Sequence, residues 1–361
     1  MTTSSGHPGA GTPHPLPVPA GLPPAAPPPA GGNELRRDPF TGRWTVIAAG
    51  RGARPSSFHR TARRPRGPLG CPFCGGNEHL TPPEIWADRA PGTPPDTPGW
   101  RIRVVPNKFA AFSGGATGAP VRDGRMPAAG AHEVIVHGPE HRTGLLDLEP
   151  GTLAAAVGAW RRRLAHHAAG PLGSVVVIVN DGREAGASLE HSHAQVFATA
   201  LRPELVQAEV DRLACGSCAA CELVAGERAG GVRLVRDADG LVTTCPWASL
   251  LPFESLLLPG RHSPRLEADP ATGDQALAAG VADALARLRA AVGHHPPVNL
   301  VVHSAPPGVA DFHWHLHVLP RLATLGGFEL GTGVLINVVD PDHAAARLRA
   351  AARKAPPLSD R

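Results

Sequence analysis

The chain has 361 residues, of which 42% are hydrophobic and 18% are charged, and its formal net charge is +4. This length and composition suffice for one or two globular domains with a large core. No stretch approaches the roughly 18 consecutive apolar residues of a membrane helix, so we expect no membrane span. The small positive charge includes no basic run longer than the arginines at 161–163, so we expect no nucleic-acid partner.

The first 33 residues consist almost entirely of Pro, Ala, Gly, Ser and Thr. Such a segment cannot bury enough apolar surface to pack, so it predicts a disordered or polyproline tail. It also lacks a basic stretch followed by an apolar block, which disfavours a secretory signal. We therefore expect a cytoplasmic protein in a reducing environment.

The rest of the sequence predicts a mixed α+β fold in which a second half repeats the first. The elements expected in the first half are strands at 43–48, 101–105, 133–137 and 175–179, a helix at 151–167 and an Arg/Pro-rich loop at 51–70. The second half repeats this order with a strand at 255–258, a helix at 273–292 and a strand at 298–303. We divide the ordered chain into halves at 34–205 and 206–361.

Cysteines and histidines repeat in the same order in both halves. Each half begins with a Cys-x-x-Cys pair, and two histidines follow at nearly equal spacing in the two halves. The first set is Cys71, Cys74, His141 and His191, and the second is Cys218, Cys221, His262 and His313. A redox pair or simply buried thiols would explain each cysteine pair, but neither would require the matching histidines.

Each Cys2His2 set can close a tetrahedral zinc site and leave no coordination position open, as in structural zinc sites. The sequence therefore predicts about two zinc ions per chain. Cys215 lies close enough in sequence to compete with Cys218 or Cys221 as a ligand.

The run from His191 to Gln195 suggests chemistry beyond metal binding. Alternation along a strand would place His193 and Gln195 on the same face as His191 and send Ser192 to the other. A glycine-rich turn at 182–188 precedes this run, and its N–H groups and the Ser188 hydroxyl could cradle phosphate. A neutral His193 beside a held phosphate is a candidate nucleophile that would form a phosphoramidate. The alternative is a buried structural histidine.

Residues 186–195, Gly-Ala-Ser-Leu-Glu-His-Ser-His-Ala-Gln, resemble the active-site strand of galactose-1-phosphate uridylyltransferases, a family of the histidine-triad superfamily. The resemblance extends to the segments at 34–44, 71–78, 103–109, 132–136 and 326–333. One departure is Ser192, where the family usually has proline, and we expect a looser backbone there. The resemblance implies two histidine-triad-like halves, each an antiparallel sheet with packed helices.

The resemblance also implies a ping-pong nucleotidyl transfer in a homodimer with shared sites. His193 would attack the α-phosphorus of a nucleotide sugar, expelling a sugar 1-phosphate, and a second sugar 1-phosphate would then accept the nucleotidyl group. Gln195 and Ser188 would stabilise the phosphoryl oxygens. The residues implied in substrate binding are Arg51 and Arg54 near phosphates, Asn107 and Asn180 near the nucleotide, Gly186 and Ala187 in the turn, and Gly327, Glu329 and Thr332 near the hexose. Because the sites are shared in the implied dimer, the last three have two possible sources, the same chain or the partner subunit.

The second half resembles a degenerate copy. His315 stands at the position of the nucleophile, but His317 follows it in place of glutamine, and no glycine turn precedes it. Some family members bind iron in this half through a glutamate and three histidines. Glu209, His303, His315 and His317 occupy suitable places, although we rank iron there below the second zinc site.

Three functions follow from these observations. The first is a UDP-glucose:hexose-1-phosphate uridylyltransferase of galactose metabolism. The second is an ADP-sugar phosphorylase that uses the same covalent chemistry. The third is a non-enzymatic, zinc-stabilised basic binding module.

Overall fold

The computed structural model describes residues 33–49, 67–114, 124–213 and 218–352. The predicted tail, the candidate phosphate ligands Arg51 and Arg54, and the competing thiol Cys215 fall outside these ranges, apart from Asn33 at the end of the tail. No helix in the described ranges is both long and apolar enough to cross a membrane.

A single ten-stranded sheet forms the centre of the fold. Its strands, in spatial order, are β3 (Trp86–Arg89), β4 (Trp100–Pro106), β5 (Gly130–Val136), β7 (His193–Thr199), β6 (Ser174–Asp181), β11 (Val298–His303), β12 (His315–Pro320), β10 (Ser255–Pro259), β9 (Leu241–Thr244) and β8 (Leu234–Ala238). All neighbouring pairs are antiparallel. The first five strands come from the first half of the chain and the other five from the second.

The two expected sheets are therefore halves of one sheet, which are joined where β6 pairs with β11. Strand order within each half is the same, because β3, β4, β5, β7 and β6 correspond in sequence to β8, β9, β10, β12 and β11. The α+β class and the predicted helices and strands of the described residues are confirmed. The division into two domains remains a prediction.

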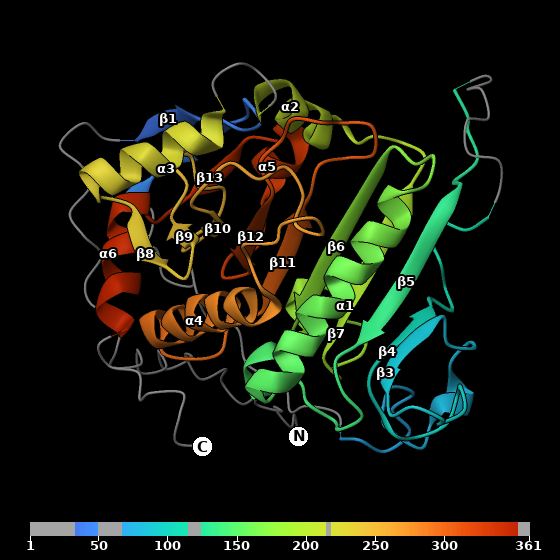
Figure 1. The fold of residues 1–361 in the computed structure, drawn as a ribbon. Helices are drawn as coiled ribbons and strands as arrows, with labels where there is room; N and C mark the ends of the chain where they lie inside the picture. The colour runs from blue at the N-terminus through green and yellow to red at the C-terminus, as the bar shows by residue number, and fades with distance from the viewer. Residues whose placement is uncertain (1–32, 50–66, 115–123, 214–217, 353–361) are drawn as a thin grey trace, which may run out of the picture.

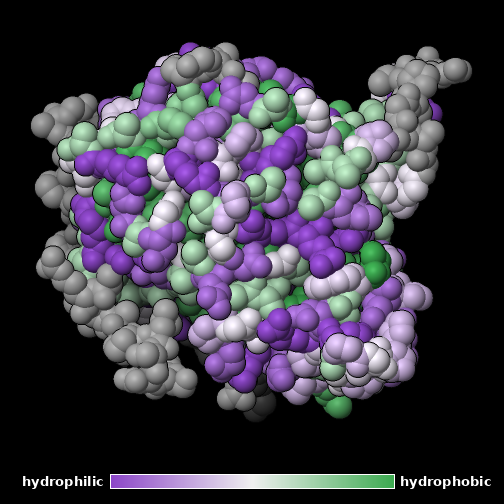
Figure 2. All heavy atoms as spheres, viewed as in Figure 1, coloured by the Kyte–Doolittle hydropathy of each residue, from purple (hydrophilic) through white to green (hydrophobic). Residues whose placement is uncertain are grey.

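Two long helices cover one face of this sheet. They are α1 (Pro150–Ala168) and α4 (Asp274–Val292), which contact one another and lie in front of the strands in Figure 1. On α4, Leu277, Val281, Leu285 and Leu288 recur at helical spacing and are almost fully buried. They join Trp160 of α1 in the main hydrophobic core. The solvent side of this layer intersperses polar and apolar groups, as Figure 2 shows.

The opposite face of the sheet differs between the halves. Over the second half lie α2 (Glu204–Leu213), α3 (Ala219–Gly230) and a small sheet of β1 (Glu34–Arg37), β2 (Trp44–Ile47) and β13 (Leu335–Asn337). The helix α6 (Pro341–Ala352) packs on α4, and α5 (Gly327–Thr332) leads into β13. Short 3-10 turns occur at Glu78–Leu80, Leu145–Asp147 and Arg183–Ala185. Over the first half this face carries a smaller apolar cluster around Phe73 and Trp100.

Candidate active site and metal centres

Strand β7 presents His193 and Gln195 on the face opposite α1. Ala194 and Val196, which alternate with them, are fully buried in the main core beneath α1. The predicted pairing of His193 with Gln195 on one face is therefore confirmed by the strand geometry. His191 lies before the first residue of β7, so its ring is placed by the preceding turn and not by strand alternation.

The His193 ring is held in one tautomer. Its Nδ1 lies 2.8 Å from the carbonyl oxygen of His191, so the Nδ1–H donates there and Nε2 keeps its lone pair. Only 5% of the residue is exposed, and the edge of Phe73 packs against the ring with centroids 5.2 Å apart. Burial lowers the pKa of His193, although its bond to the His191 carbonyl opposes this shift. The geometry thus provides a neutral, oriented imidazole.

Gln195 is oriented by a residue that sequence reasoning left without a role, His132. The backbone N–H of Ala111 donates to His132 Nδ1 at 3.1 Å, so Nε2 carries the hydrogen and donates to Gln195 Oε1 at 2.7 Å. The Gln195 amide group is thereby left with both N–H bonds available. Asn107 lies beside His132, with Nδ2 3.0 Å from His132 Nε2, and its contact with the nucleotide remains a prediction. The only signal for His132 was its place in the 132–136 motif.

The glycine turn follows β6 and has two residues in positive-φ conformations, Gly182 at φ 94° and Gly186 at φ 95°. The N–H groups of Ala185 and Ala187 donate to the Gly182 carbonyl, and that of Gly186 donates to the Arg183 carbonyl. These amides are used to build the turn, so the predicted amide cradle is not available from them. Ser188 is exposed beyond the turn.

Ser192 is held more firmly than its replacement of proline predicts. Its backbone N–H donates to the Arg142 carbonyl at 2.6 Å, and its carbonyl accepts from the backbone N–H of His137 at 3.1 Å. The Ser192 hydroxyl lies 3.0 Å from His137 Nδ1, whose Nε2 accepts from Trp160 Nε1 at 3.1 Å. The expected loosening is therefore wrong, because a buried hydrogen-bond network replaces the constraint of the pyrrolidine ring.

The first Cys2His2 set comes together as predicted. Cys71 and Cys74 Sγ each lie 3.6 Å from His191 Nδ1, and Cys74 Sγ lies 3.4 Å from His141 Nδ1. Bonds of about 2.3 Å from zinc to sulfur and about 2.1 Å to nitrogen in a tetrahedron place these atoms about 3.6 Å apart. His191 Nε2 donates to the Gly138 carbonyl at 2.9 Å, which leaves Nδ1 as the ligand atom. The residues therefore fit a zinc ion.

The second set repeats this arrangement. Cys221 Sγ lies 3.6 Å from both His262 Nδ1 and His313 Nδ1, and Cys218 Sγ lies 3.6 Å from His313 Nδ1. His313 Nε2 donates to the Pro259 carbonyl at 3.0 Å, the counterpart of the His191 bond. The side chain of His262 is partly exposed and is paired with Asp311 at 3.0 Å. This site also fits zinc but lies nearer the surface.

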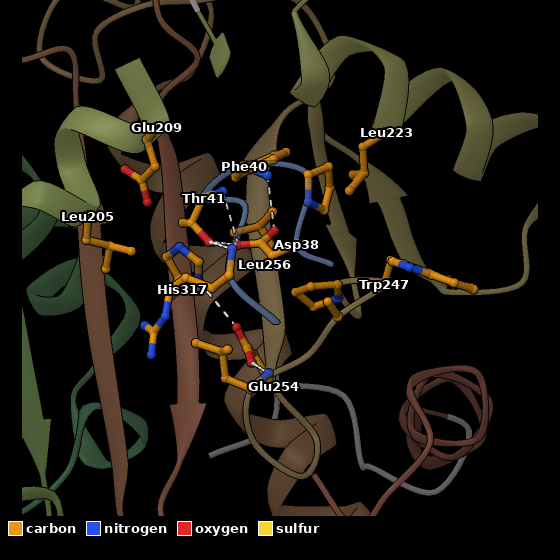
Figure 3. Close-up of a pocket in the computed structure, with 15 residues that line it drawn as sticks. Asp38, Phe40, Thr41, Leu205, Glu209, Leu223, Trp247, Glu254, Leu256 and His317 are labelled. Carbon is orange, nitrogen blue, oxygen red and sulfur yellow. Dashed lines mark hydrogen bonds and ion pairs between the residues drawn. The ribbon is translucent and has the colours of Figure 1, made fainter. Parts of the chain in front are cut away.

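A third group consists of the iron-type residues Glu209, His303, His315 and His317, whose ligand atoms all lie within 4.8 Å of one another. His303 Nδ1 is 2.7 Å from Glu209, while the buried His315 Nε2 has no hydrogen-bond partner. Burial alone would raise the pKa of Glu209, but His303 and His315 lower it. Glu209 and His317 also line a cavity of about 50 Å³, together with Thr41 and Leu205 (Figure 3). The donor set fits a metal cation.

The residues implied at the hexose lie on α5, in the second half. Glu329 accepts the backbone N–H of Gly326 at 2.9 Å, and the Thr332 hydroxyl donates to the Phe328 carbonyl at 2.7 Å. Gly327 and Thr332 are exposed. Within the described ranges these contacts are local to α5, so the assignment of this helix to a substrate site remains a prediction.

The comparisons with known proteins agree with this geometry. Residues 106–203 match the model of the family described as galactose-1-phosphate uridyl transferase, N-terminal domain. The chain is 30% identical over 339 residues to ADP-glucose phosphorylase from Arabidopsis thaliana, covering 88% of this chain and 92% of that protein. It is 25% identical over 340 residues to galactose-1-phosphate uridylyltransferase from Thermotoga maritima, covering 88% and 98%. The crystal structure of the Arabidopsis phosphorylase with bound ADP-glucose superimposes with a TM-score of 0.74 at 28% identity, covering 88% of this chain and 99% of that one.

Two repeated halves that share one antiparallel sheet, each with a histidine pair at the start of the strand next to the junction strand, define a protein of the histidine-triad class. Within that class the chain belongs to the galactose-1-phosphate uridylyltransferase family. It is an enzyme, and specifically a nucleotidyltransferase.

Proposed function

We propose that the enzyme transfers a nucleotidyl group from a nucleoside diphosphate sugar through a covalent adduct on His193. One observation carries this proposal: the His193 Nδ1–H bond to the His191 carbonyl leaves the lone pair of Nε2 free. Gln195, on the same strand face, supplies amide hydrogens for the oxygens of the attacked phosphate.

The two half-reactions balance without an outside oxidant or metal. His193 Nε2 forms a bond to the α-phosphorus as the bond from that phosphorus to the bridging oxygen breaks, and the sugar 1-phosphate leaves with the bonding pair. In the second step a phosphate oxygen of the acceptor attacks the same phosphorus and the P–N bond breaks. His193 recovers its free lone pair.

Two donors are candidates. The alignment with ADP-glucose phosphorylase favours ADP-glucose, with inorganic phosphate as acceptor and ADP as the second product. The match to the uridyl transferase family model favours UDP-glucose, with galactose 1-phosphate as acceptor, and hence a role in galactose metabolism. We place ADP-glucose first, because that alignment has the higher identity over the same share of the chain.

The proposal includes zinc in both Cys2His2 sets, because the ligand distances match a tetrahedral ion. Zinc in these closed sites would be structural and would tie the Cys-x-x-Cys segments to the sheet. Iron or another divalent metal is the second proposal, for the group around Glu209. A homodimer that shares its sites, and a cytoplasmic location that keeps these thiols reduced, complete the proposed function.

The experiment uses ADP-glucose and UDP-glucose, each labelled at the α-phosphate and each tested without an acceptor. The productive donor should leave acid-labile, base-stable label on the protein, and its matched acceptor, phosphate or galactose 1-phosphate, should remove that label. His193→Ala should abolish labelling and turnover while metal content stays the same. His191→Ala is the contrasting variant and should lower metal content and thermal stability. An adduct that persists in His193→Ala would disprove the assignment of the nucleophile.

A further inference from the structure

Asn299 belongs to the second half but touches the glycine turn of the first. It is the Cα partner of Asn180 in the β6–β11 pairing that joins the halves. Its Nδ2 lies 2.8 Å from Asn180 Oδ1 and 2.6 Å from the carbonyl oxygen of Ala185, inside the turn. One amide group of the second half therefore connects the end of β6 to the turn before the histidine strand.

These contacts determine which way both amides face. A backbone carbonyl only accepts hydrogen bonds, so Asn299 must present its nitrogen to Ala185. That nitrogen has two hydrogens, and the second is directed to Asn180, which must then present its oxygen. The Asn180 NH2 group is consequently directed away from Asn299. It lies on the Gly186 side, since a Cβ built on Gly186 would be 3.6 Å from Asn180 Nδ2.

The neighbouring residues of the second half support the same turn. His295 Nε2 lies 3.3 Å from Asp181 Oδ1, immediately before the turn. Pro297 approaches Gly182 so closely that a Cβ added to this glycine would meet Pro297 atoms at 3.1 and 3.2 Å. Together with Asn299, these residues form a brace at 295–299 along one side of the turn.

We infer that Asn299 is a positioning residue, by which the second half orients Asn180 and the 182–186 turn for the nucleotide. The inference rests on the proposed function and on the nucleotide contact that the family resemblance implies for Asn180. It also gives the second half a direct part in the reaction of the first.

The test is Asn299→Asp, which keeps the shape of the side chain and removes both donors. The new carboxylate faces two acceptor oxygens, so it should turn Asn180 and displace Ala185. We expect the Kd for AMP or UMP, measured by calorimetry, and the KM for the matching nucleotide sugar to rise by about tenfold, the loss of roughly one hydrogen bond. We expect kcat to change less than KM, because Asn180 binds the nucleotide in the ground state as well.

The matched control is Asn337→Asp in β13. Asn337 Nδ2 also donates to two carbonyls, those of Ser249 and Leu251 at 3.1 and 3.2 Å, and the residue is almost fully buried. Asn337→Asp should lower the melting temperature about as much as Asn299→Asp does, and it should leave nucleotide affinity unchanged. Asn299→Ser, which adds no charge, should give a smaller rise in Kd and serves if the aspartate variant does not fold.

The outcomes separate the two proposals. If the Asn299 variants bind nucleotide as tightly as the wild type or the Asn337 control, the positioning role is overturned. If the wild-type protein binds nucleotide but forms no histidine adduct from either nucleotide sugar, the covalent mechanism fails, and the Kd comparison still decides the role of Asn299.

Discussion

Hydrogen bonds hold the backbone at Ser192, a position where the resembled family usually has the ring constraint of proline. Its N–H, carbonyl and hydroxyl all have partners, and the hydroxyl connects through His137 to the indole of Trp160. His137 is fully buried, and burial holds its pKa well below the usual value, with the charges of His193 and His191 adding to the shift. It is therefore a neutral hydrogen-bonding group that fixes the segment between His191 and His193.

Restoring proline at this position should destabilise the protein. Ser192→Pro removes the N–H that bonds to the Arg142 carbonyl and the hydroxyl that contacts His137, so we expect a loss of more than about 1 kcal/mol. Ser192→Ala removes only the hydroxyl and should cost less. Urea denaturation of both variants measures the difference. A proline variant as stable as the wild type would show that the network contributes nothing beyond the ring.

Much of the site could be predicted at the residue scale because its chemistry lies in short motifs. The sequence identified His193, Gln195 and both Cys2His2 sets, and the structure brings together the members of each set. It could not identify His132, His137 or Asn299, since their roles depend on partners across strands or between halves. The sequence also predicted more phosphate-binding N–H groups in the 182–188 turn than the structure leaves available. Sequence alone does not reveal that several of these groups donate hydrogen bonds within the turn.

At the scale of elements, each Cys-x-x-Cys segment is connected to a strand end by its histidines, in addition to its apolar packing against the sheet. Burial and the neighbouring Cys71 raise the pKa of the Cys74 thiol to about 11 in the protein without a cation, and a bound divalent ion would favour the thiolate. Cys245 is also buried but belongs to none of the metal-type groups of the described chain. A comparison of Cys74 with Cys245 therefore distinguishes the loss of a metal ligand from the alteration of a buried thiol.

Cys74→Ser should therefore lower both zinc content and melting temperature, whereas Cys245→Ser should lower only the melting temperature, and by less. The physical reason is that the first change removes a zinc ligand, while the second costs about 1–3 kcal/mol for a buried hydroxyl. Elemental analysis should find about two zinc ions in the wild type and about one in Cys74→Ser. Equal metal content in the two variants would contradict the first site.

The contact between His295 and Asp181 predicts how pH affects the junction between the halves. Its hydrogen bond to Asp181 raises the pKa of His295 above the ordinary value of about 6.5, against the opposing effect of burial. Because the pKa of His295 is higher in the folded than in the unfolded protein, its stabilising effect is complete at pH values below the unfolded-state pKa. The effect is lost as the pH rises through the folded-state pKa.

His295→Gln should therefore reduce stability at pH 5.5 more than at pH 8.5. The imidazole is more than one-third exposed, so we expect a difference of less than about 1 kcal/mol. Thermal melts of the variant and the wild type at several pH values measure it. A stability gap that widens as pH rises would have the opposite sign and would rule out this linkage.

At the scale of the whole molecule, one sheet contains two halves with the same strand order. The halves differ in what covers the sheet face opposite α1 and α4. The sequence predicted the repeat because hydrophobic periodicity and ligand spacing recur in both halves. It could not predict that the two sheets merge, because the β6–β11 pairing depends on long-range register. In the described residues, the face of the first half that contains His193 carries the small apolar cluster with Phe73, whereas the corresponding face of the second half is covered by α2, α3 and the small three-stranded sheet.

This covering should restrict covalent chemistry to one histidine per chain. His315 has the same Nδ1–H bond as His193, at 2.9 Å to the His313 carbonyl, so its tautomer alone would permit attack. Phe40 and Phe312, however, pack on its ring with centroids 5.4 and 5.8 Å apart, and the carboxylate of Glu209 lies 3.7 Å from its Nε2. The carboxylate beside Nε2 would repel an approaching α-phosphate, and His315 is fully buried.

Saturating the protein with the productive labelled donor should therefore give at most one nucleotidyl group per chain, all of it on His193. Intact-protein mass spectrometry gives the stoichiometry, and peptide mapping under basic conditions, in which phosphoramidates survive, gives the position. The His193→Ala protein under the same conditions is the control and should carry no label at His315. Label on a peptide containing His315 would mean that the second half opens to substrate, and that the aromatic and carboxylate cover over its histidine is not a fixed part of the fold.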